Sequence, residues 1–453
     1  MAAAVAVERL APGGARRPLT LSFGSSVVIQ GINVLTGMAL ARSLGPHGRG
    51  ELAAVLLWPN VLAAIGSLGV IEAITFHTAR STAAAGTLAG SGLLIATAQS
   101  AACVGIGAAT LPLVFMHYGA GTMRTAYFFL AFIPANLLTL TLMAVLNGLQ
   151  RFAEFHALRL LSIVGTGAAF LVLRIADNLT VWNVTAAYLL ATTLTGLAAA
   201  TMLAPSLWRS IRFDAGLSRQ LLGFGLRSHT GNVTWMMNER LDQLIISIFL
   251  APVQLGLYVT AVTMTSLTNL VGQSVATAAF PVVARMDAGT ERRDRVRNFV
   301  RLALFGSVAA TVPLILVTPQ LIHVFFKDAY LDAVNVARVL MVAAVVLSVN
   351  RVLGACLRAL GRPLDAGIPE LLALAVTVGG LAVLLPALGI MGAAIVSLLA
   401  YAVSTGWMLR RVAKALDVPV ASILFVDRAD MSRLAHAVWP ARRRVEASAK
   451  AGE

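Results

Sequence analysis

The sequence predicts an all-α integral membrane protein with about twelve spanning helices in two pseudo-symmetric six-helix lobes around a central polar cavity. Three observations lead to this fold class. Of the 453 residues, 58% are hydrophobic and 12% are charged, with a mean hydropathy of +0.82. Soluble domains carry about 25% charged residues. Apolar runs long enough to cross a bilayer recur along the chain, and similar turns recur in its two halves.

The net charge of +15 needs an explanation other than nucleic acid. The positive residues are scattered between apolar runs and do not cluster on an amphipathic surface, so we expect no nucleic-acid partner. Cys103 and Cys356 both lie inside apolar runs, which indicates small buried residues and no disulfide framework. We therefore interpret the excess of basic residues as a signal that orients the protein in a membrane.

The spans are assigned in order by their apolar length, about 20 residues each. Residues 1–19 hold three arginines and no cleavage pattern, so we expect a cytoplasmic N-terminus and no signal peptide. The fifth span has only 14 residues between Arg159 and Arg174, whose side chains we expect to snorkel outward. The predicted spans lie in 21–41, 52–71, 81–123, 127–148, 155–173, 179–203, 221–250, 252–285, 302–326 and 334–357, with two more in 371–408 broken around 386–389.

The distribution of Lys and Arg supports this topology. With both termini inside, the loops predicted to be cytoplasmic carry 26 of these residues and the opposite loops carry 5. We therefore expect a multi-pass protein of the cytoplasmic (inner) membrane with both termini cytoplasmic. Its predicted parts are a cytoplasmic N-terminus (1–19), a first lobe (20–203), a cytoplasmic connector (204–220), a second lobe (221–411) and a basic cytoplasmic tail (412–453).

Turn motifs repeat between the two predicted lobes. Leu44-Gly45-Pro46 with Gly50 matches Leu250-Ala251-Pro252 with Gly256, and residues 146–151 match 357–362. The offsets of the repeated motifs stay between 201 and 211. Because each repeat has an even number of spans, the copies should be related by an axis along the membrane normal, with a substrate path between them.

The span at 221–250 contains charged residues at depths in the bilayer where the insertion of each charge costs about 2.5–3.5 kcal/mol. Arg227 and Asp242 fall within an arc of about 60° on one helical face, and Arg240 lies on the other side. We expect the arginines to bind an anionic headgroup; the alternative is a set of buried ion pairs that lock helices together. Asp242 could be an arginine partner or a proton or cation site. The other polar groups expected to line the cavity are Gln30, Asn33, Asn232, Asn238, Asn269, Gln273 and Arg351.

Missing motifs narrow the function class. The sequence has no phosphate-binding GK[ST] loop and no usable HExxH, CxxC or GxSxG pattern. The predicted outer loops are too short for a catalytic domain. We therefore expect no enzyme, no cofactor and no metal site.

Four motifs in the sequence resemble those of the Wzx-type polysaccharide flippases. They are NERLDQ at Asn238–Gln243, GLY at Gly256–Tyr258, FPVVAR at Phe280–Arg285 and RSLGP at Arg42–Pro46. The Wzx-type flippases belong to the multidrug/oligosaccharidyl-lipid/polysaccharide exporter superfamily, and the resemblance covers about residues 18–411. Twelve spans fit its oligosaccharide and multidrug branches, whereas lipid II flippases usually have fourteen.

The resemblance implies a MATE-like fold that flips an undecaprenyl-diphosphate-linked oligosaccharide to the outer leaflet by alternating access. It implies that Arg227, Arg240 and Arg351 bind diphosphate or acidic sugars, that Asn and Gln groups bond sugar hydroxyls, and that Asp242 couples an ion gradient. Membrane lipids and other glycan-assembly proteins are the expected partners.

Two alternatives stay open. A cation-coupled multidrug extruder would need an acidic lobe site with aromatic lining, and the first half offers only Glu72. A membrane glycan ligase or polymerase would need a large outer loop, for which the longest candidate is Pro319–Asn335.

Overall fold

The computed structural model describes residues 16–207 and 210–425, without the side chains of 16–30, 206, 230–233 and 235. Every regular element in these ranges is helical. The main helices are α2 (Arg16–Gly66), α3 (Val70–Arg80), α4 (Ala85–Val114), α5 (Ala120–Phe129), α6 (Phe132–Gly148), α7 (Phe152–Ile175), α8 (Val181–Leu207), α9 (Ala215–Phe249), α10 (Pro252–Met264), α11 (Ser266–Ala284), α12 (Thr290–Leu316), α13 (Thr318–Phe326), α14 (Ala333–Ala359), α15 (Pro363–Leu416) and α16 (Val420–Leu424).

The helices confirm the all-α membrane fold class. Within the described residues, eight helices are long and apolar enough to cross a membrane, and a ninth span results if α2 from Gly31 is joined to α3 across a 49° bend. Two long helices contain a kink: α2 at Gly45, with φ of 67°, and α15 at Gly389, with φ of 57°. The second kink lies where the sequence predicted a break in 371–408, because glycine adopts positive φ without steric cost.

The fifth span is longer than its uncharged run suggested. Helix α7 has 24 residues and includes both Arg159 and Arg174. Arg174 lies in its last turn, where a cation interacts favourably with the helix dipole, and is paired with the exposed Asp177 at 3.8 Å. The helix therefore reaches spanning length by incorporating its flanking arginines.

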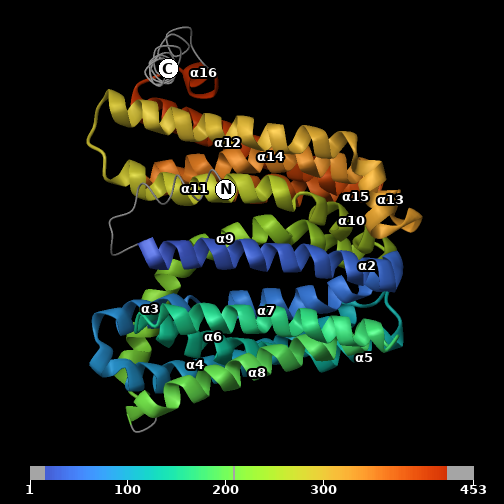
Figure 1. Cartoon of the computed structure of the whole chain (residues 1–453), viewed down its shortest axis with the longest axis vertical. Helices are drawn as coiled ribbons and strands as arrows, with labels where there is room; N and C mark the ends of the chain where they lie inside the picture. The colour runs from blue at the N-terminus through green and yellow to red at the C-terminus, as the bar shows by residue number, and fades with distance from the viewer. Residues whose placement is uncertain (1–15, 208–209, 426–453) are drawn as a thin grey trace, which may run out of the picture. The chain divides into compact units, whose positions relative to one another are not determined.

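The chain divides into two compact units. The first is formed by Met1–Ser266, Pro313–Ala343 and Glu370–Ala400, and the second by Leu267–Val312, Ala344–Pro369 and Tyr401–Glu453. In the first unit, α4, α6, α7 and α8 lie side by side (Figure 1). Its core is strongly apolar, with fully buried aromatic side chains that include Phe115, Phe129, Tyr258, Phe326 and Tyr330.

The repeated proline-glycine motifs contact each other inside the first unit. A Cβ atom on Gly50 in α2 would collide with the carbonyl oxygen of Pro252, and one on Gly256 in α10 would collide with that of Pro46. Each of these hypothetical Cβ atoms would lie 3.0 Å from the amide nitrogen of the other glycine. The contact is therefore reciprocal, as expected for two motifs related by a two-fold axis, and only glycine permits this backbone approach.

The second pair of repeated turns has the same backbone geometry in both copies. Gln150 and Gly361 adopt positive φ values of 60° and 74°. The next residue in each copy donates its amide to a carbonyl five residues back, from Arg151 to Leu146 at 3.0 Å and from Arg362 to Leu357 at 2.9 Å. The lobe boundaries stay a prediction. They were derived from the sequence repeat, and the matching turns support that repeat.

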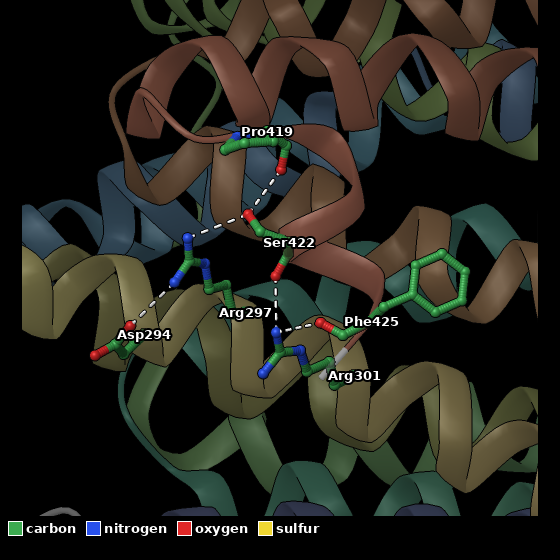
Figure 2. Close-up of polar contacts among 6 residues, drawn as sticks. All are labelled: Asp294, Arg297, Arg301, Pro419, Ser422 and Phe425. Carbon is green, nitrogen blue, oxygen red and sulfur yellow. Dashed lines mark hydrogen bonds and ion pairs between the residues drawn. The ribbon is translucent and has the colours of Figure 1, made fainter. Parts of the chain in front are cut away.

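In the second unit, two arginines of α12 hold α16 (Figure 2). Arg301, only 8% exposed, donates from Nη2 to the carbonyl oxygen of Ser422 at 2.8 Å and to that of Phe425. Arg297 donates to Ser422 Oγ at 3.1 Å. The fully buried Ile423 of α16 packs into the hydrophobic core of the second unit. The beginning of the predicted tail is thus folded onto α12, while residues 426–453 lie outside the described ranges.

Candidate functional site

A polar pocket of about 840 Å³ lies within the first unit. Its walls come from α2, α5, α6, α7, α8, α9 and α10. Both apolar and polar residues line it, and the lining contains three arginines but a single carboxylate, that of Glu239. The charged or amide-bearing residues of the lining are Asn33, Arg49, Asn60, Asn136, Arg159, Glu239, Arg240 and Gln243.

Helical spacing explains how the first half presents these groups. On α7, Arg159, Ser162, Thr166 and Phe170 are spaced by three or four residues and share one face. On α2, the kink at Gly45 starts a new helical segment, so that Arg49 lies on the same face as lining residues further along, including Asn60. Helices α2 and α7 therefore each present their polar pocket residues along one face.

Arg49 is the cation most clearly available to a ligand. Its Nε atom is buried and has no hydrogen-bond partner among the described residues. Tyr188 and Tyr330 are its electrostatic neighbours. Burial raises the pKa of Tyr330, which outweighs the opposite effect of Arg49, so the phenol stays neutral and donates to the carbonyl oxygen of Ala41 at 2.9 Å. A neutral phenol does not cancel the charge of Arg49, and a buried guanidinium strongly favours an anionic partner.

The other two arginines are held loosely. Arg240 has an exposed side chain and donates to Gln243 Oε1 at a long 3.4 Å. The guanidinium of Arg159 lies 6.0 Å from the ring centroid of Phe155. Since forked guanidinium donors match phosphate oxygens, the pocket can hold an anionic group of the diphosphate type.

The structure brings two of the predicted binding residues, Asn33 and Arg240, into this pocket. Asn238 is buried outside its lining, where Nδ2 donates to the backbone oxygen and to Oε2 of Glu370 at 2.9 and 2.7 Å. Arg227 is exposed on α9 and is also outside the lining. Asn269, Gln273 and Arg351 belong to the second unit, and the side chains of Gln30 and Asn232 lie outside the described residues.

Asp242 lies in a buried polar cluster beside this pocket's α9 wall. It is 7% exposed and accepts hydrogen bonds from the hydroxyl of Tyr258, from the Gln243 amide at 2.7 Å and from Ser397 Oγ at 3.4 Å. Two of the three donors are hydroxyl groups, which can also accept a hydrogen bond. The cluster can therefore adjust to a proton or cation on the carboxylate. Among the described residues, no group of three or more His, Cys, Asp or Glu side chains could hold a metal ion.

Sequence reasoning missed Arg49 and Arg159 as pocket residues. Arg49 was assigned to a loop between two spans, and Arg159 was expected to snorkel outward from the fifth span. The signal was present in the spacing: Arg49, Ala53, Asn60 and Ala64 fall on one helical face once the helix is extended backward to Pro46. Arg159 likewise shares a face with Ser162 and Thr166.

Solved membrane proteins share the fold of this chain. The lipid II flippase MurJ in an inward closed conformation aligns with a TM-score of 0.73 and 12% identity, covering 89% of each chain. An inward-facing multidrug resistance MATE transporter of the MOP superfamily aligns with a TM-score of 0.71 and 16% identity, covering 85% of this chain and 95% of that one. These similarities show that the chain has the same fold as these two proteins.

The family is shown by sequence. Residues 39–335, well over half of the chain, match the profile of the polysaccharide biosynthesis protein family, and the protein belongs to that family. A curated relative, the "probable low-salt glycan biosynthesis flippase" of Haloferax volcanii, is 24% identical over 192 residues. That alignment covers 42% of this chain and 40% of the relative, so the chain matches about two fifths of the relative's length.

Proposed function

We propose that the protein flips a lipid-linked oligosaccharide precursor across the cytoplasmic membrane by alternating access, with undecaprenyl diphosphate as the lipid carrier. The observation that carries this proposal is the pocket with three arginines against one carboxylate. A sugar headgroup cannot cross hydrocarbon unaided, whereas its lipid tail is already soluble there. The pocket supplies what the headgroup lacks: cations for its phosphates and polar groups for its hydroxyls.

The family and fold support the same reading. The chain belongs to the polysaccharide biosynthesis protein family, and the curated relative in Haloferax volcanii is described as a glycan biosynthesis flippase. The excess of cations in the pocket disfavours a multidrug extruder of cationic compounds, because like charges would face each other in a low-dielectric site. Both termini are cytoplasmic in this proposal, and Arg227 and Arg351 serve the headgroup outside the described pocket.

Leaflet-specific labelling tests the function. Cells with the protein should show lipid-linked glycan accessible to a membrane-impermeant label on the outer face, and cells lacking it should not. Arg49→Gln removes one charge-assisted contact, so labelling should fall about tenfold or more. The matched control is Arg124→Gln, since Arg124 is exposed and outside the lining. Unchanged outer-face glycan in cells lacking the protein would overturn the proposal.

Asp242 is the proposed coupling residue, supported by its burial and its hydroxyl donors Tyr258 and Ser397. In vesicles, collapsing the proton or sodium gradient should slow translocation by the wild-type protein. In Asp242→Asn, which keeps the shape and removes the titrating group, the residual rate should no longer depend on the gradient. A variant that responds to the gradient as the wild type does would assign coupling elsewhere.

A further inference from the structure

The wall of the pocket between its arginines carries threonine hydroxyls whose protons are used within their own helices. Thr36 on α2, Thr166 on α7 and Thr192 on α8 all line the pocket. Each donates its hydroxyl proton to the carbonyl four residues earlier in its own helix, at 2.8, 2.7 and 2.9 Å to Ile32, Ser162 and Tyr188 respectively. A hydroxyl has one proton and two acceptor lone pairs. Toward the pocket, these side chains can therefore only accept.

These threonines form one continuous surface. Helices α7 and α8 are joined by a short turn and so run antiparallel. The rings of Phe170 and Tyr188 meet edge to face at 5.1 Å, and Thr166 and Thr192 each lie one helical turn from this pair, toward the same end of the bundle. A Cβ atom on Gly167 would lie 3.6 Å from Thr36 Cγ2, which places Thr36 beside α7. The three threonines thus line the same pocket, and Thr166 and Thr192 lie close to an aromatic pair.

Charge restricts what this surface can bind. Arg49 is an electrostatic neighbour of Tyr188 at one end of the wall, and Arg159 lies two helical turns before Thr166 at the other. A cationic donor such as an ammonium would be repelled by the arginines. A carboxylate has only acceptors to offer and would meet the lone pairs of the threonines. An uncharged sugar rich in O–H donors satisfies the wall, and the diphosphate attached to that sugar satisfies the arginines.

We infer that Thr36, Thr166 and Thr192 form a sugar-reading surface that accepts hydrogen bonds from the hydroxyl groups of an uncharged sugar ring, the ring next to the diphosphate. The Phe170 and Tyr188 rings offer an apolar face for the C–H side of the same sugar. This inference rests on the proposed function and adds a selectivity to it: neutral sugars are preferred at this position over acidic ones.

Binding to the full-length protein in nanodiscs tests the surface with two probes. One is undecaprenyl diphosphate carrying a neutral disaccharide, and the other is bare undecaprenyl diphosphate. Thr166→Val with Thr192→Val keeps the side-chain shape and removes both acceptors. Affinity for the sugar-bearing probe should fall about tenfold or more, with no change for the bare lipid. Arg49→Gln should weaken both probes.

The chain supplies a matched control at the neighbouring position. Thr193 makes the same bond to the carbonyl four residues earlier, at 2.9 Å, but is exposed and outside the lining. Thr193→Val should leave both affinities unchanged, and Thr166→Ser with Thr192→Ser, which restores the acceptors, should retain wild-type binding. Equal weakening of both probes, or of neither, by the valine variant overturns the sugar-reading surface. Failure of the wild-type protein to bind either probe instead overturns the proposed function.

Discussion

Corresponding helices of the two predicted repeats carry very different side chains. With the offset of 211 that relates Arg151 to Arg362, Arg159 in α7 corresponds to Glu370 in α15. Ala186-Ala187 also matches Ala393-Ala394, and with this offset of 207 Thr192 in α8 corresponds to Leu399. Arg159 and Thr192 line the pocket, whereas Glu370 bonds Asn238 and Leu399 is 48% exposed.

The repeat therefore conserves backbone features more strictly than chemistry. The turns at 146–151 and 357–362 keep the same hydrogen bonds and the same positive φ. The proline-glycine motifs keep their close approach. Of the charged or amide-bearing residues that line the pocket, in contrast, most come from the first copy, and Glu239, Arg240 and Gln243 come from the second. Arg49 corresponds by the offset of 206 to the fully buried Leu255.

The largest effect is expected at the backbone contact that the two repeats share. Gly50→Ala and Gly256→Ala each place a Cβ atom into a carbonyl of the opposite helix, which should lower the free energy of unfolding by about 3 kcal/mol. Denaturation in detergent would measure the loss. The matched control is Gly165→Ala, since a Cβ atom there meets nothing within 4 Å and alanine favours the helix by about 1 kcal/mol. Similar stabilities for all three variants would show that the reciprocal contact is absent in solution.

A smaller effect should separate the two repeats at one equivalent position. Glu370→Ala removes an acceptor of the buried Asn238, so stability should fall by about 1 kcal/mol, with little change in binding of the glycan-bearing lipid. Arg159→Ala should do the reverse: about tenfold weaker binding, and a stability change under about 0.5 kcal/mol. Paired measurements of binding and unfolding on both variants would decide this. If both variants lost mainly binding, or both lost mainly stability, the assignment of binding to Arg159 and of stability to Glu370 would be wrong.

Long apolar helices could be predicted from the sequence because they depend on local apolar length and on turn residues. The break at Gly389 is one example. The pocket was only partly predictable. Arg240 and Asn33 were recognised as polar residues in apolar runs. Arg49 was not, because its helix begins before its apolar run does.

Long-range partners set the remaining differences. Asn238 lies on the face of α9 that the sequence predicted to line the cavity. Its side-chain amide instead donates hydrogen bonds to Glu370, which is 132 positions away in sequence. Asp242 likewise depends on Tyr258 and on Ser397, which is 155 positions away. No local periodicity identifies such partners, since they are defined only when the helices pack.

The reciprocal contact of Gly50 and Gly256 also bears on how such a chain could originate. Each motif offers one glycine and one carbonyl and receives the same from the other, so a six-helix ancestor could have made this contact with a copy of itself. Gene fusion would then have needed no new interface. Freed from pairing with an identical partner, each half could then acquire its own side chains.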